Sequence, residues 1–64
     1  MTNKQLAAAR RVMSRFPNLT VRKTDETLTP VNGETSGAPV VVTENMSAAE
    51  VEGLLRQSCA AVDG

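Results

Sequence analysis

Residues 46–62 carry the pattern that most constrains the fold, an amphipathic helix with a clear start. Ser47 is a suitable N-cap, and Glu50 three residues later completes a capping box. Met46 and Val51 flank the cap in the positions of a hydrophobic staple. The apolar face predicted for this helix repeats at helical spacing and consists of Val51, Leu54, Leu55, Ser58 and Val62. Because that face must be buried, we expect the preceding residues to form a second layer over it.

The length of 64 residues allows one domain, residues 1–64, with a modest core. Domains of this size bury only about 60% of the surface of the unfolded chain. Cys59 is the single cysteine, so no disulfide can form within the chain, and only one side chain is aromatic. A homodimer, or stabilisation by a partner, is therefore a reasonable expectation.

A shorter helix is predicted at the start of the chain. Thr2 can act as its N-cap, with Gln5 three residues later as a weaker capping box. Pro17 ends it near Phe16, because a residue before proline disfavours helical backbone. Its predicted apolar face consists of Leu6, Ala9, Val12, Met13 and Phe16.

Residues 19–23 alternate between apolar and polar side chains, which predicts a half-buried strand. Residues 24–26 are suited to a turn, and residues 27–31 are a possible second strand. Pro30 cannot donate a backbone hydrogen bond, so this second strand is expected at an edge of the sheet or in irregular structure.

Residues 39–43 form the clearest strand pattern, with a run of valines that indicates at least partial cover on both faces. The preceding Asn32-Gly33 pair favours a turn, but residues 34–37 continue it as a polar loop, which leaves a tight hairpin open. The sequence therefore predicts an α+β fold in the order helix, two- or three-stranded antiparallel sheet, helix. Both helices are expected on one face of the sheet.

The sequence contains neither a membrane-spanning pattern nor a secretion pattern. The longest apolar run, residues 38–42, is too short to cross a bilayer, and no apolar segment typical of a signal peptide follows Lys4. A lone cysteine also fits a reducing compartment. We therefore expect a cytoplasmic protein without membrane contact.

The residues offer little for catalysis. The chain has no histidine, the usual base for serine and cysteine nucleophiles. Cys59 lies at the flank of a predicted buried face, which is typical of a small packed side chain. Gly33 and Gly37 do not have the spacing of a phosphate-binding loop. We therefore expect a protein that is not an enzyme and has no cofactor and no metal.

The charges are divided unequally along the chain. Residues 1–24 contain six basic residues and no acidic one, whereas residues 25–64 contain seven acidic residues and only Arg56 as a base. The formal net charge of zero therefore conceals two opposed segments. Such asymmetry indicates an electrostatic partner or internal neutralisation.

Three interpretations follow from this charge pattern. The segments can neutralise each other, with Glu52 and Arg56 as an i,i+4 ion pair. The first helix can bind nucleic-acid phosphates, although no aromatic stacking residues accompany it, which disfavours direct nucleic-acid binding. The acidic segment can engage a basic surface on another protein. The residues for the second are Lys4, Arg11 and Arg15, and those for the third are Asp25, Glu26, Glu34, Glu44, Glu50 and Glu52.

The outer side of the last helix carries the small residues Ala49, Gly53 and Ala60. Glycine inside an exposed helix costs about 1 kcal/mol relative to alanine. Gly53 therefore suggests a close approach by a partner or by a second copy of the chain, and the alternative is a tolerated surface glycine.

In size and charge pattern the chain resembles the very small phage proteins that block host systems, including anti-CRISPR inhibitors. The resemblance rests on the 64-residue length, the lack of catalytic groups and the acidic residues within 25–63. It implies a protein-binding inhibitor that mimics nucleic acid and covers a basic nucleic-acid-binding site on a host protein. A small nucleic-acid-binding protein and a homo-oligomeric structural or assembly protein stay as the alternatives.

Overall fold

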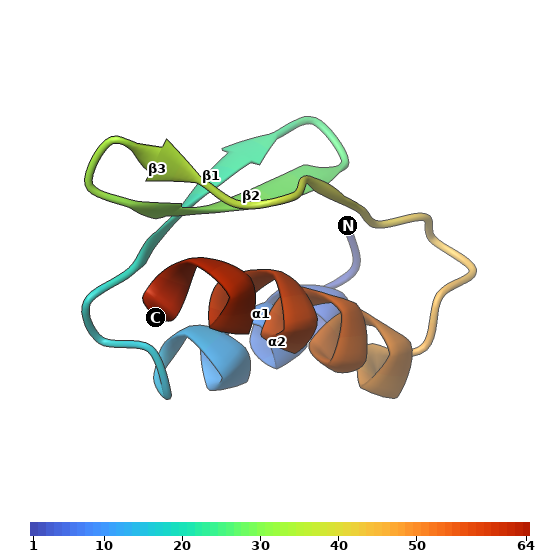
Figure 1. The fold of residues 1–64 in the computed structure, drawn as a ribbon. Coiled ribbons are helices and arrows are strands. Elements are labelled where there is room, and N and C mark those ends of the chain that lie inside the picture. Colours follow the sequence, from blue (N-terminus) through green and yellow to red (C-terminus); the bar gives the residue numbers. More distant parts are fainter.

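Two helices lie side by side beneath a small antiparallel sheet in the computed structural model, which describes residues 1–64 (Figure 1). The elements in chain order are α1 (Asn3–Met13), β1 (Thr20–Thr24), β2 (Thr27–Asn32), β3 (Thr35–Ser36), β4 (Val40–Val41) and α2 (Ala48–Asp63). This arrangement confirms the predicted α+β fold with both helices on one face. The sheet has four strands, because the valine-rich segment and a short hairpin both pair with β2.

Strand β2 is the centre of the sheet and pairs antiparallel with β1, β3 and β4. The expectation that Pro30 places this segment at an edge or in irregular structure was therefore wrong. The carbonyl oxygen of Pro30 accepts a hydrogen bond from the backbone nitrogen of Gly37 at 2.7 Å. In an antiparallel strand the N–H and C=O of one residue point to the same side. An N–H group at Pro30 would point to the segment that joins β3 to β4. Its absence therefore interrupts no hydrogen bond to β1.

Both hairpins are tight. Thr24 pairs with Thr27, which leaves two residues in the β1–β2 turn. Asn32 pairs with Thr35, so the hairpin that the sequence left open also has a two-residue turn. Gly33 has a φ of 62°, a left-handed conformation that glycine adopts without steric cost.

The segment 39–43 is shorter as a strand than its pattern predicts. Only Val40 and Val41 are paired, as β4. Val40 and Val42 are buried, whereas 58% of the surface of Val41 is exposed. The expected partial cover on both faces is provided by the helices on one face of the sheet only, and the other face leaves Val41 exposed (Figure 1).

Helix α1 ends at Met13 and not near Phe16, since the backbone turns tightly after Val12. Its buried side chains are Gln5, Ala8, Ala9 and Val12. The apolar face predicted for α1 is therefore rotated by part of a turn from the observed buried face, because Leu6, Met13 and Phe16 are only half-buried. The capping box of Thr2 and Gln5 is complete.

Helix α2 begins after Ser47, whose hydroxyl oxygen accepts a hydrogen bond from the backbone nitrogen of Glu50 at 3.1 Å. Only this half of the predicted capping box forms, because the Glu50 carboxylate does not accept a hydrogen bond from the backbone N–H of Ser47. The buried side chains of α2 are Val51, Leu55, Ser58 and Cys59. Leu54, which the helical pattern assigns to the buried face, is 43% exposed and was therefore misassigned. Neither helix has the length and apolar character needed to cross a membrane.

Candidate functional site: the groove between β4 and α2

The acidic residues are spread over several parts of the molecule. Asp25 and Glu26 form the β1–β2 turn, and Glu44 lies between β4 and α2. The backbone nitrogen of Val42 donates to the carbonyl oxygen of Glu26 at 2.7 Å, which brings these two segments to one end of the sheet. Glu34 forms the β2–β3 turn at the opposite end of β2 (Figure 1). A six-residue strand spans roughly 17–20 Å, so Glu34 is well separated from the other turn.

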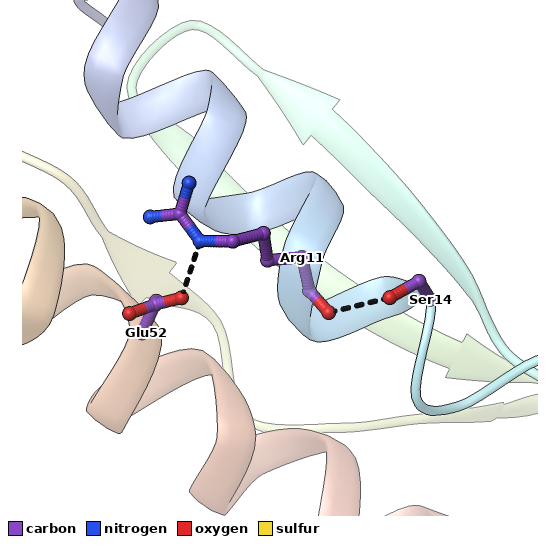
Figure 2. Close-up of polar contacts among 3 residues, drawn as sticks. All are labelled: Arg11, Ser14 and Glu52. Carbon is purple, nitrogen blue, oxygen red and sulfur yellow. Dashed lines mark hydrogen bonds and ion pairs between the residues drawn. The ribbon is translucent and has the colours of Figure 1, made fainter.

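Glu52 lies between the helices and bonds to a basic residue of α1. The Nε atom of Arg11 donates to Oε1 of Glu52 at 2.8 Å (Figure 2). The i,i+4 ion pair expected between Glu52 and Arg56 is not the contact that forms. The hydrogen bond from Arg11 lowers the pKa of Glu52, against the opposing effect of partial burial, and the charges of Arg11, Arg56 and Arg15 lower it further.

The ion pair joins the two oppositely charged segments of the chain. Arg11 comes from the proposed phosphate-binding set and Glu52 from the proposed acidic surface. The contact therefore supports internal neutralisation for this pair, although an ion pair at the surface adds little to the stability of the fold. Lys4 is exposed on α1, and Arg15 is exposed in the turn after it.

Cys59 is buried between the helices, and its Sγ atom lies 3.7 Å from Sδ of Met13. Burial raises the pKa of the Cys59 thiol, and the charge of Asp63 raises it further. A protonated, packed thiol is a poor nucleophile at neutral pH. Cys59 therefore acts as a core side chain, as its position in the sequence predicts.

An apolar groove of about 330 Å³ runs between β4 and α2. Val41 and Leu54, the two exposed large hydrophobic residues of the molecule, are both among the residues that line it. The lining contains no charged side chain, and its members are Ala38, Pro39, Val40, Val41, Leu54, Gln57, Ser58 and Ala61.

The edge of β4 that borders this groove has free backbone groups. Val42 directs its N–H to Glu26 on the β2 side. Because successive residues of a strand point their backbone groups to opposite sides, the N–H and C=O of Val41 point away from β2. The groove thus lies between an unpaired strand edge and a helix.

Ser58 holds the two walls of the groove together at one end. Its hydroxyl group donates to the carbonyl oxygen of Ala38 at 2.6 Å. Gly37, the preceding residue, lies so close to α2 that an added Cβ would be 3.0 Å from the Ser58 hydroxyl oxygen. The position of the β4 segment against α2 is therefore fixed by a buried hydrogen bond and a close contact.

The small residues Ala49, Gly53 and Ala60 are exposed on the outer side of α2. A Cβ atom added at Gly53 would have no neighbour within 4 Å, so no other part of the chain approaches this glycine. This outer side is distinct from the groove, which Leu54 and Ala61 reach from the adjoining side of the helix.

Comparisons of this chain with protein-family models, with curated proteins and with solved structures gave no match. The class of protein is thus defined by its own fold, a small two-layer α+β domain with an apolar strand–helix groove.

Proposed function

We propose that this chain is a non-enzymatic binding domain that docks a partner protein in the groove between β4 and α2. The observation that carries the proposal is the meeting of Val41 and Leu54 in one groove beside an unpaired strand edge. Exposed apolar patches with polar surroundings are typical of interaction sites. A free edge next to a helix also offers backbone hydrogen bonds to an extended segment of a partner.

Two of the predicted acidic contacts lie in the chain segments next to the lining of this groove. Glu50 lies one helical turn before Leu54 on the same side of α2. Glu44 follows the β4 segment in the loop that leads to α2. Carboxylates at the rim of an apolar contact favour a partner with basic residues around an apolar anchor, and they increase the association rate.

The specific form of this proposal is an inhibitor of the anti-CRISPR type. Such a protein would cover a basic nucleic-acid-binding site on a host protein, with Glu44 and Glu50 facing basic side chains and Leu54 as the apolar anchor. Its support is the small size of the chain, its acidic residues and the apolar groove, which has Glu44 and Glu50 in the segments next to its lining.

Two neighbouring alanines allow a matched test. Ala61 lines the groove, whereas Ala60 is exposed on α2 outside it. The immobilised protein would be incubated with a host lysate, and the proteins retained by the wild type would be quantified for each variant. We expect Ala61→Arg to abolish retention of the specific partner and Ala60→Arg to preserve it. The proposal fails if Ala60→Arg abolishes retention and Ala61→Arg does not, because the partner would then bind the outer side of α2.

The inhibitor proposal has a separate test. Reversal of charge at Glu44 and Glu50 to lysine is expected to weaken partner binding and to reduce its dependence on salt. The partner should also lose nucleic-acid binding when the wild-type protein is added.

Light scattering after size exclusion, for the wild type and Ala61→Arg, shows whether the occupant of the groove is a second copy of the chain.

A further inference from the structure

A second groove, of about 300 Å³, lies at the opposite edge of the sheet, between β1 and α1. Its lining differs from that of the first groove because it includes two cations, Arg10 on α1 and Lys23 on β1. The remaining lining residues are apolar: Leu6, Ala9, Met13, Val21 and Leu28. Leu6, Met13 and Val21 are only half-buried, so an apolar floor stays accessible beneath the strand edge.

The outer edge of β1 also has unpaired backbone groups. Pro30 directs its carbonyl oxygen to Gly37, away from β1, so its partner Val21 is not hydrogen-bonded to β2 at this position. By the same alternation Lys23, opposite Leu28, points its N–H and C=O away from β2. The edge therefore presents two donors and two acceptors to a further strand, directly above the apolar floor.

The charges around this edge define the partner. Arg22 is exposed on β1, beside Lys23, and the whole segment 1–24 contains no acidic residue. Pairing of two β1 edges would bring these cations of two copies close together, and like charges on adjacent strands are unfavourable. Acidic side chains on the added strand would instead be attracted to Arg10 and Lys23.

We propose that the groove between β1 and α1 binds an extended acidic segment of another protein, which adds to the sheet as a strand beside β1. Backbone groups of that segment pair with Val21 and Lys23. Alternate side chains of a strand point to the same face, so one apolar side chain rests on Leu6 and Met13. The side chain two residues away is a carboxylate that reaches Arg10 and Lys23.

Strand β1 contains a matched pair of cations for the test. Lys23 shares a face of the strand with Val21 and lines the groove, whereas Arg22 points to the opposite face of the sheet. A displayed library of random nine-residue peptides would be selected on the wild-type protein. Affinities of the enriched peptides, labelled with a fluorophore, would then be measured by anisotropy for Lys23→Gln, Arg10→Gln and Arg22→Gln.

We expect the enriched peptides to share an apolar residue and an acidic residue two positions apart. Lys23→Gln and Arg10→Gln should each weaken binding about tenfold or more, and Arg22→Gln by clearly less. Bound peptide should slow hydrogen exchange of the backbone amides of Val21 and Lys23. Ala61→Arg, which fills the other groove, should leave the affinity unchanged.

Three results would overturn the inference. Selection that yields no acidic peptides shows that Lys23 only prevents edge-to-edge association, a common role of lysine on edge strands. Equal losses in Arg22→Gln and Lys23→Gln show attraction to net charge without a defined site. Exchange protection at Val41 in place of Val21 assigns the peptides to the β4–α2 groove, which would leave the proposed function intact.

Discussion

Gln5 connects three parts of the molecule through one buried side chain that is 2% exposed. Its Oε1 atom accepts from the backbone nitrogen of Thr2 at 2.9 Å. Its Nε2 atom donates to the carbonyl oxygens of Thr43 at 2.7 Å and Met46 at 3.0 Å. These bonds attach the start of α1 to the loop that joins β4 to α2. Loss of the side-chain amide should therefore weaken the whole domain.

The substitution Gln5→Met keeps a similar side-chain volume and removes all three of these hydrogen bonds. At about 1 kcal/mol net for each bond, the free energy of unfolding should fall by about 3 kcal/mol. A chain of this length has a total stability of about 3–10 kcal/mol at the usual value per residue. The melting temperature should therefore fall by at least about 10 °C.

Urea unfolding followed by circular dichroism measures this loss. The midpoint should decrease while the slope m stays unchanged, because the surface exposed on unfolding is the same. The matched control is Gln57→Met, at an exposed position of α2, which should change the stability by about 0.5 kcal/mol or less. A loss below about 1 kcal/mol for Gln5→Met, or an equal loss in the control, would refute the assigned role.

Three further predictions concern two glycines and the pH dependence of one ion pair. Gly53→Ala should stabilise the protein by up to about 1 kcal/mol, because the helix is exposed there and the added Cβ meets nothing within 4 Å. Gly37→Ala should destabilise the protein by about 1–3 kcal/mol, because its Cβ would lie 2.9 Å from Cγ of Pro30. Thermal melts of both glycine variants check that the two stability changes have opposite signs. The pKa of Glu52 is lower in the folded state, so its pairing with Arg11 stabilises the fold above the ordinary pKa of glutamate, and this contribution is lost as the pH falls through the folded pKa. The melting temperature of Glu52→Gln should therefore be lower than that of the wild type at pH 7, and this difference should vanish in acid. A constant difference at every pH would contradict this assignment.

The order of elements could be predicted because its determinants are local. The caps at Thr2 and Ser47 use bonds between residues three positions apart. Proline after Phe16 restricts the backbone at its own position, and glycine after Asn32 permits the left-handed backbone that its turn requires. Such interactions depend on neighbours in the sequence, so the α+β order followed from the residues alone.

The groove between β4 and α2 could be predicted only in part. Glu50 was predicted as a contact because acidic residues are visible in the sequence, and it lies one helical turn before the groove residue Leu54. Leu54 and Val41 were assigned to buried faces instead. A run of three valines hides the alternation of a one-sided strand, and helical spacing alone does not show how wide the covered face is.

Long-range contacts were decided by the tertiary structure. Pro30 lies in the central strand because the chain returns along the side of β2 that faces away from β1. There the backbone nitrogen of Gly37 donates to the carbonyl oxygen of Pro30. Arg11 bonds to Glu52 across 41 residues of sequence, because the packing of α1 against α2 brings them together. The sequence by itself determined where both helices begin, since their N-caps rest on bonds between residues three positions apart. Only the packing of the two layers decided which side chains are left exposed to line the groove between β4 and α2.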